Sequence, residues 1–234
     1  MRNVFAALRP ASTQPNLKLV PASEPDPSAP LDATSGIEAS EAAAAIGLDP
    51  VKPQLALWRA KTAGASSAVA SPETQTWKET NAQYWRALLE PLVASVYTKR
   101  SGNTLRRVNL RTRHPAYPWM QAQVDWDVLG CPEVDLMRYL SVGRQDAAAW
   151  EEGLPAHERL NALHLLAVTG KQSVDLAVLV CGQELQIHRV VRDEPVIARL
   201  MRLESRFWHC VELNRPPALP GDKPMLKTEG DTHG

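Results

Sequence analysis

The chain has 234 residues, and its 26 lysines and arginines balance its 26 aspartates and glutamates, so the formal net charge is zero. Hydrophobic residues make up 44% and charged residues 22%, which is the composition of an ordinary globular protein. No apolar run reaches the length of a membrane helix, and no charged low-complexity block occurs, so a membrane-spanning, fully disordered or collagen-like chain is excluded. Zero net charge by itself argues against a nucleic-acid partner, because phosphate binding is driven by basic surface.

The cysteines and the N-terminus predict the cellular compartment. The three cysteines, Cys131, Cys181 and Cys210, are far apart and odd in number, which fits neither a disulfide framework nor a clustered zinc site. The apolar stretch 4–8 is too short for the core of a secretory signal. We therefore expect a cytoplasmic protein that has no contact with a membrane.

Composition divides the chain into a folded unit between two tails. The N-terminal stretch carries repeated prolines and little periodic apolar content, so it cannot bury enough apolar surface to offset the entropy of ordering. The C-terminal stretch is again rich in proline and glycine. We expect disordered tails at 1–35 and 214–234 and one folded domain over 36–213.

The first part of the folded unit has the pattern of helices. Ser35 and Glu38 have the spacing of a capping box before an alanine-rich segment. Pro72 opens a long segment with apolar residues at steps of three and four. The expected helices span 35–47, 55–58 and 72–97, with a linker of small residues at 63–70.

From Leu105 onward the pattern changes to strands that are interrupted by two further helices. The expected strands span 105–110, 120–129, 133–140, 174–181 and 184–191, and the helices span 155–169 and 194–211. This order predicts an α/β protein with a mixed sheet flanked by helices.

Acidic residues gather on two successive strands. Asp125 lies on one strand and Asp135 on the next. If these strands form a hairpin, the carboxylates converge, which is how proteins hold Mg²⁺ with water ligands left for a phosphate. Asp127 shares a strand face with Asp125, and Glu133 shares one with Asp135, so either is an alternative ligand. A solvent-facing pair of acidic strands also fits the spacing.

Basic residues form two sets that suit contact with DNA phosphates. The first precedes the acidic strands directly and has no acid within it, whereas the second is spaced for one side of the last helix. Both sets also fit a solvated surface, and the position of the first favours it. The first set comprises Lys99, Arg100, Arg106, Arg107, Arg111 and Arg113, and the second comprises Arg199, Arg202 and Arg206.

Six short segments together resemble one known family. They are 39–50 with Leu57-Trp58 and Lys61-Thr62, 88–91, the His-Pro-x-Tyr-Pro-Trp-Met-x-Ala-x-x-Asp stretch 114–125, 164–170, 175–180 and 207–208. In this order they resemble the YqaJ viral recombinase family, the lambda-exonuclease-like branch of the PD-(D/E)xK nucleases. The resemblance covers about residues 36 to 217. It implies a restriction-endonuclease-like mixed central sheet flanked by helices.

The resemblance also implies a site. Glu90 would be the helical acid, Asp125 and Asp135 the strand ligands, and the backbone carbonyl of Leu136 would complete the metal shell. The family site binds Mg²⁺ or Mn²⁺, as one or two ions, and hydrolyses DNA phosphodiesters.

The family's other residues and partners are expectations of the same kind. Asn161 would keep one amide of a catalytic glutamine pair, and Ser40 would contact DNA. Many relatives digest double-stranded DNA ends, assemble as rings and hand the exposed strand to a RecT-type annealing protein. We therefore expect a phage or prophage recombination exonuclease that works on double-stranded DNA as a homo-oligomer.

The departures from the family pattern fall in the active site. The family's Glu-x-Lys corresponds to Asp135-Leu136-Met137, so the lysine is missing, and a thioether cannot stabilise transition-state charge. Arg138 would point to the opposite face from Met137. Arg86 lies one helical turn before Glu90 and could bring a replacement charge, or it could fill a surface position. The alternative to an exonuclease is therefore an inactive nuclease-fold protein that binds DNA or protein.

Overall fold

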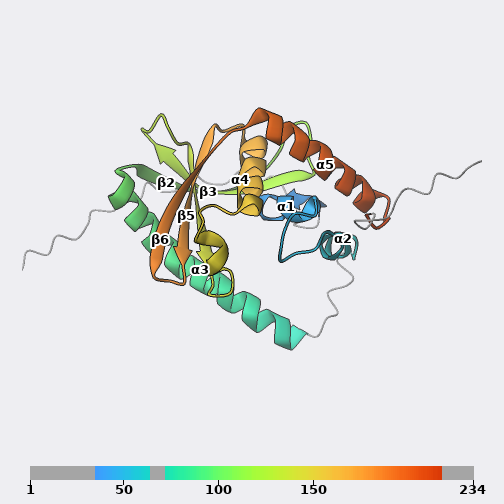
Figure 1. Ribbon diagram of the computed structural model, residues 1–234, viewed down its shortest axis with the longest axis horizontal. Coiled ribbons are helices and arrows are strands. Elements are labelled where there is room, and N and C mark those ends of the chain that lie inside the picture. The colour runs from blue at the N-terminus through green and yellow to red at the C-terminus, as the bar shows by residue number, and fades with distance from the viewer. Residues whose placement is uncertain (1–34, 64–71, 218–234) are drawn as a thin grey trace, which may run out of the picture.

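A computed structural model of the chain describes residues 35–63 and 72–217 (Figure 1). The expected N-terminal tail except Ser35, almost all of the linker 63–70, and residues 218–234 of the C-terminal tail lie outside the described residues. No helix in the described part of the chain is long and apolar enough to span a membrane.

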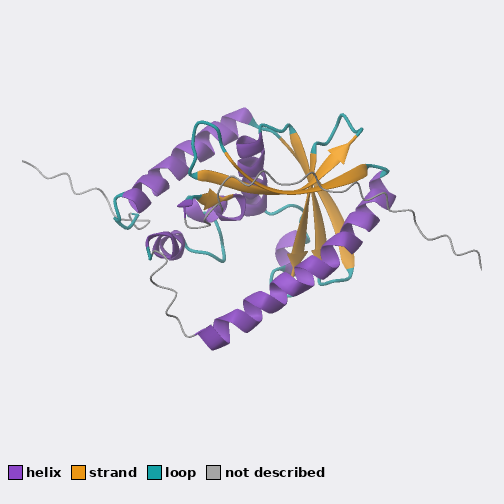
Figure 2. Cartoon of the chain, turned by 180° about the vertical axis from the view of Figure 1, so that it is seen from behind, coloured by secondary structure: helices purple, strands orange, loops and turns teal. Residues whose placement is uncertain are grey.

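The elements follow the predicted order of helices and strands, with small differences at their ends. They are β1 Ile37–Glu38, η2 Ala39–Glu41, α1 Ala42–Ala45, α2 Gln54–Thr62, α3 Pro72–Ser101, β2 Thr104–Arg113, β3 Met120–Leu129, β4 Leu136–Val142, η4 Ala147–Trp150, α4 Ala156–Thr169, β5 Ser173–Val180, β6 Glu184–Val191 and α5 Glu194–Glu212. The expected mixed α/β sheet flanked by helices is confirmed (Figure 2).

The predicted start of the first helix was wrong by several residues. Ile37 and Glu38 form a short strand, and the Ile37 amide donates to the carbonyl of Trp119 at 2.6 Å. The cap lies further along the chain, because the Glu38 amide donates to the Glu41 carboxylate at 3.1 Å. The sequence pattern missed this strand because two residues are too few to show an alternation.

The sheet has an irregular centre at β3. Its strand order is β1-β3-β4-β5-β6, with β2 paired to β3 outside this path. The β1–β3 and β4–β5 pairs are parallel, and the other pairs are antiparallel. Because β2 follows one edge of β3 along nearly its whole length, β1 and β4 share the other edge at different places.

This sharing leaves a break in the sheet, which we call the strand gap. Glu38 of β1 pairs with Gln121, whereas Met137 of β4 pairs with Trp126. Between these two points, residues 122–125 of β3 have no strand partner on that edge in the described part of the chain. Side chains from β1, β3 and β4 can therefore meet at one place.

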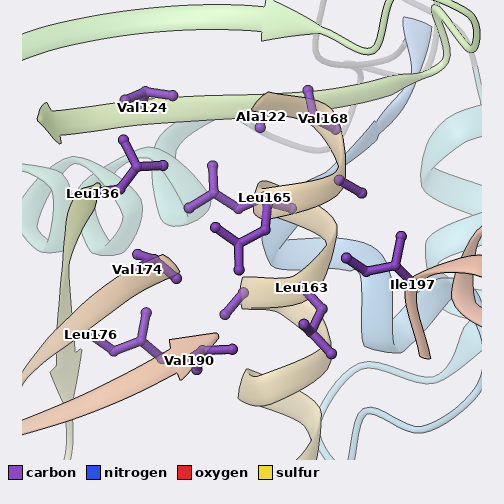
Figure 3. Packing of buried hydrophobic residues seen from close by; sticks show 14 of the residues in the cluster. Ala122, Val124, Leu136, Leu163, Leu165, Val168, Val174, Leu176, Val190 and Ile197 are labelled. Carbon is purple, nitrogen blue, oxygen red and sulfur yellow. The ribbon is translucent and has the colours of Figure 1, made fainter. Parts of the chain in front are cut away.

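Hydrophobic cores cover both faces of the sheet. On one face α4 packs against β3, β4 and β5, and Leu136, Leu163 and Val174 belong to this larger cluster (Figure 3). On the other face lies α3, and Met137 packs there with Tyr97. Neighbouring residues of β4 thus point to opposite faces, as strand geometry requires. Figures 1 and 2 show α3 crossing the strands on the side away from α4.

Buried polar groups join the helices to the sheet. On α4, His164 Nδ1 lies 2.8 Å from Glu204 of α5, and its Nε2 lies 3.1 Å from the backbone carbonyl of Gln121. On the opposite face, the Tyr97 hydroxyl donates to Asp175 at 2.8 Å, and burial is the main cause that raises the pKa of Tyr97 to about 12. These bonds fix both helices against the central strands.

Candidate active site at the strand gap

Five charged side chains gather around the strand gap, and we call them the gap cluster. The strands β1, β3 and β4 each contribute one of them, and the helices α3 and α4 contribute the other two. The cluster consists of Glu38, Arg86, Asp125, Arg138 and Glu158.

Asp125 is held by an arginine from α3. Arg86 Nη2 lies 3.3 Å from Asp125 Oδ2, and Asp125 is only 8% exposed. The Arg86 guanidinium therefore reaches Asp125 from the helix, and its expected catalytic role stays a prediction. The contact leaves Asp125 neutralised by a positive charge on the protein itself.

Arg138 brings a second positive charge into the gap cluster. Burial lowers the pKa of the Arg138 guanidinium, while the negative charges of Asp125, Glu158 and Glu38 act to raise it. Its Nε atom is buried and has no hydrogen-bond partner among the described residues. A buried guanidinium nitrogen without a hydrogen bond is costly unless acids or a bound anion lie near it.

Met137 stands where the family has its lysine, and the structure places it in the core. Met137 is 1% exposed and packs in the hydrophobic cluster under α3, so it does not point into the gap cluster. Arg138, next along β4, is the residue of this strand that reaches the charges around Asp125. Met137 is therefore a core residue, and the strand's contribution to the site is an arginine.

Glu90 is engaged away from Asp125. Its carboxylate accepts a 2.8 Å hydrogen bond from Trp126 Nε1, and the side chain is 7% exposed. The bond ties α3 to the middle of β3. Glu90, the helical acid expected to bind a metal, is thus hydrogen-bonded to a side chain of the strand.

Asp135 also has a different partner from the expected one. It lies just before β4 rather than within the strand predicted over 133–140. Its carboxylate accepts from the amides of Gln172 and Ser173 at 2.8 and 3.2 Å, which fastens the turn between α4 and β5. The chain preceding Leu136 is therefore a loop, and its acid, Asp135, stabilises the fold.

The alternative acids are paired as well. Asp127 forms an ion pair with Arg106 of β2. Glu133 lies 2.9 Å from Arg189 of β6 and is largely exposed. Neither acid takes part in the gap cluster.

The expected metal-ligand set is not assembled. No group of three or more His, Cys, Asp or Glu side chains among residues 35–63 and 72–217 is arranged to hold a metal ion. Glu90, Asp125 and Asp135 each bond to a different partner. Because Asp125 is already paired with the Arg86 guanidinium and no second acid is arranged beside it in the described part of the chain, the residues as they lie do not fit a divalent cation.

Asn161 contacts the gap cluster through one of its members, Glu158. Its Oδ1 atom accepts from the Ala43 amide at 3.1 Å, and its Nδ2 atom donates to Glu158 at 3.3 Å. The buried amide joins α4 to α1 and positions Glu158. Its expected catalytic role stays a prediction.

The residues predicted to contact DNA lie mainly on β2, the edge strand. Ser40, Arg106, Arg111 and Arg113 are exposed, and Arg107 is partly buried. Each arginine has a partner within the protein. The partners are Asp127 for Arg106, the Trp126 ring at 5.8 Å for Arg107, Glu38 at 3.4 Å for Arg111 and Ser35 at 3.2 Å for Arg113.

Sequence patterns missed three members of the gap cluster. Glu38 was placed in a helix cap, Glu158 follows no motif, and Arg138 was set aside because of its strand parity. Arg138 shares a face with Asp125 because Met137 pairs with Trp126, and no local sequence pattern specifies that register.

The fold is that of the lambda-exonuclease-like nucleases. The alkaline exonuclease LHK-Exo from Laribacter hongkongensis superimposes with a TM-score of 0.59 at 17% identity, covering 77% of this chain and 90% of that one. A second structure, of LHK-Exo in complex with dAMP, gives a TM-score of 0.56. A phage-related exonuclease from Haemophilus somnus 129PT gives 0.57 at 10% identity, covering 76% of this chain and 94% of that one.

The chain belongs to the family defined by the YqaJ-like viral recombinase domain, whose model matches residues 33–172. It is 30% identical over 195 residues to the uncharacterized protein YqaJ of Bacillus subtilis (strain 168). The match covers 82% of this chain and 58% of that relative's length. The predicted family and fold are therefore confirmed.

Proposed function

We propose that this protein binds the ends of double-stranded DNA in phage-type recombination and does not hydrolyse them by the metal-dependent route of its fold. The observation that carries the proposal is the contact of Arg86 with Asp125. A carboxylate that is already paired with a guanidinium is less available to a divalent cation, and the guanidinium beside it can bind a phosphate. As a phage or prophage protein it would act in the cytoplasm of a bacterial host.

The exposed arginines of β2 support the DNA-binding part of the proposal. Arg106 and Arg111 are each paired with an acid, yet their side chains are 44% and 42% exposed. Exposed ion pairs contribute little to stability, so a guanidinium can exchange its carboxylate for a DNA phosphate at small cost. The strand then forms a basic edge beside the strand gap.

Two measurements on the purified chain test the proposal. Anisotropy of a labelled blunt duplex should rise on binding, and the affinity should fall steeply with salt. Incubation of linear duplex with Mg²⁺ or Mn²⁺ should release no nucleotides. An active exonuclease of the same fold is the positive control, and rapid digestion by this chain would contradict the proposal.

A second candidate is the exonuclease activity itself, with Mg²⁺ or Mn²⁺ as cofactor. The contact of Arg86 with Asp125 favours it, because a guanidinium there can replace the charge of the missing lysine. Under this candidate the duplex is digested, and Arg86→Ala or Asp125→Ala abolishes the digestion. Digestion that survives Asp125→Ala would exclude the gap cluster as its site.

Assembly with itself or with a RecT-type annealing protein is part of the same proposal. α3 carries a row of exposed apolar side chains at Tyr84, Trp85, Leu88, Leu92 and Val96. A contiguous exposed apolar row is typical of a contact with another protein. Light scattering of the wild type and of Leu88→Lys/Leu92→Lys tests it, and a monomer in both cases would exclude a homo-oligomer.

A further inference from the structure

A pocket lies apart from the gap cluster, between the loop that precedes β3 and the outer side of α5. Its volume is about 400 Å³, which is large enough for an aromatic base. The loop supplies two aromatic rings and α5 supplies the opposite wall. The lining residues are Tyr117, Trp119, Ala198, Met201, Arg202, Ser205 and Arg206.

The aromatic wall continues as a row of rings. The ring centroids of His114 and Tyr117 are 5.1 Å apart, and those of Tyr117 and Trp119 are 5.9 Å apart. Trp119 in turn stacks on Trp208 at 6.5 Å and 16°. Tyr117, between His114 and Trp119, is 44% exposed, so the row includes a ring that is accessible to solvent. Such faces bind nucleobases by stacking, with little dependence on sequence.

The loop holds these rings in position before any ligand binds. His114 Nδ1 accepts from the amides of Ala116 and Tyr117 at 3.1 and 3.2 Å, and the Tyr117 carbonyl accepts from the Met120 amide at 2.8 Å. Pro115 and Pro118 fix their own backbone angles. A ligand therefore pays little entropy to order this wall.

The α5 wall supplies positive charge. Arg202 and Arg206 are one helical turn apart, both exposed, and neither forms a hydrogen bond or ion pair with another described residue. Most other arginines near the sheet are paired with an acid or a carbonyl. Two unpaired guanidinium groups facing an aromatic wall match the chemistry of a nucleotide, with its flat base and charged phosphate.

The pocket is also within reach of the gap cluster. Trp119 directly precedes β3, and Asp125 lies on that strand, so an extended chain separates them by about 20 Å at roughly 3.3 Å per residue. A few nucleotides of single strand span this distance. An unpaired strand that starts at the strand gap can therefore end in the pocket.

We propose that this pocket is a single-stranded DNA subsite, in which a base stacks on Tyr117 and Trp119 while Arg202 and Arg206 bind the adjoining phosphates. The inference rests on the proposed function, because it assigns a binding site to the unpaired strand of a DNA end that the protein binds. It extends that function from duplex binding to the unpaired strand.

Anisotropy with the full chain and two labelled probes tests the subsite. One probe is a blunt duplex and the other is the same duplex with an oligothymidine overhang. Arg202→Gln/Arg206→Gln should weaken overhang binding at least about tenfold and lower its salt slope by about one to two. Tyr117→Leu should weaken it by about tenfold through lost stacking and leave the salt slope unchanged.

Matched controls separate this subsite from general charge loss. Arg144→Gln/Lys171→Gln removes the same charge from exposed positions outside the pocket, and Leu48→Ala removes an exposed apolar side chain away from both the pocket and α3. Both controls should bind the overhang as the wild type does. Circular dichroism melts check that every variant folds.

The outcomes distinguish the two proposals. If the wild type binds the blunt duplex and the pocket variants bind the overhang as tightly as the controls, the subsite is wrong and duplex binding stands. If no DNA binds, both proposals fail. If a synthetic peptide of the proline-rich segment 215–226 binds in a Tyr117-dependent manner while the overhang does not, the pocket is a peptide site and the inference is overturned.

Discussion

Arg86 Nη2 lies 3.3 Å from Asp125 Oδ2, so the acid that the family motif assigns to a metal is paired with a guanidinium from α3. The contact crosses from a helix to the strand gap, and Arg138 adds a second positive charge from β4. The gap cluster thus combines two arginines with three acids, and its charges largely compensate one another. The predictions below test this arrangement and the fold that supports it.

The two arginines should differ in what they contribute to stability. Arg86→Gln should change the free energy of unfolding by less than about 1 kcal/mol, because its side chain is 45% exposed and its ion pair is screened by solvent. Asp125→Ala should cost more, about 1–3 kcal/mol, because it removes an acid beside the buried Arg138. Urea denaturation measures both values. Equal changes in the free energy of unfolding would mean that Asp125 does not stabilise the charge of Arg138.

Met137→Lys should unfold the protein rather than restore a nuclease. The side chain is 1% exposed among Tyr97, Trp126 and other apolar residues, so a lysine there must be buried without a partner or lose its charge. Urea denaturation should show that the free energy of unfolding falls by several kcal/mol. For the control Met137→Leu it should fall by less than about 1.5 kcal/mol. A stable lysine variant that digests linear DNA would return position 137 to the active site.

The buried pair of His164 and Glu204 should make stability depend on pH. Burial opposes the charged imidazolium, but the charge and hydrogen bond of Glu204 outweigh it, so the pKa of His164 is raised. Both ring nitrogens face acceptors, so both contacts are hydrogen bonds only when the ring is protonated.

The sign follows from the direction of that shift. The folded pKa exceeds the unfolded value of about 6.5, so this contribution is full below about pH 6.5 and is lost as the pH rises through the folded pKa. Urea denaturation across this range should show the decline in the wild type. Glu204→Gln should flatten it, and an equal slope in both proteins would contradict the assignment.

Gly36→Ala should disturb the approach of β1 to β3. A Cβ atom at Gly36 would lie 2.5 Å from the backbone carbonyl of Trp119 and 2.5 Å from the Gln121 side chain. The backbone cannot move aside at low cost, so we expect the free energy of unfolding to fall by about 1–3 kcal/mol. Duplex binding should also weaken, because Glu38 moves with the strand. The matched control is Gly143→Ala, where nothing lies within 4 Å of the new Cβ atom, and its stability should be unchanged.

Much of the fold could be predicted from periodic patterns. The helix at 155–169 and the strands at 174–181 and 184–191 match α4, β5 and β6 closely. The apolar content of α4 extends over a helical length, β5 is a short and mainly apolar run, and β6 alternates apolar and polar residues over most of its length. The start of β4 was predicted three residues too early. Glu133 and Asp135 continue the alternation, yet their side chains bond to Arg189 and to the turn before β5, so they lie in a loop.

The interpretation of the site depended on the pairing register of β4 rather than on where the strand begins. With the strand assumed to begin at Glu133, Asp135 and Met137 seemed to occupy the motif positions, and Arg138 seemed to be turned away. Pairing of Met137 with Trp126 and Asp175 buries it under α3 instead. No local pattern specifies such a register, because it depends on which strands meet and where they separate.

The sequence by itself determined the family and the mixed sheet, and it made Arg86 a candidate to reach the site from α3. Those follow from ordered motifs, from alternation along strands and from the four-residue spacing of a helix. Only the tertiary structure decided that Glu90 and Asp135 bond elsewhere, that Arg138 enters the gap cluster, and that Tyr117 and Trp119 face the arginines of α5. The physical reason is that these contacts join residues distant in sequence, and packing, not local propensity, selects them.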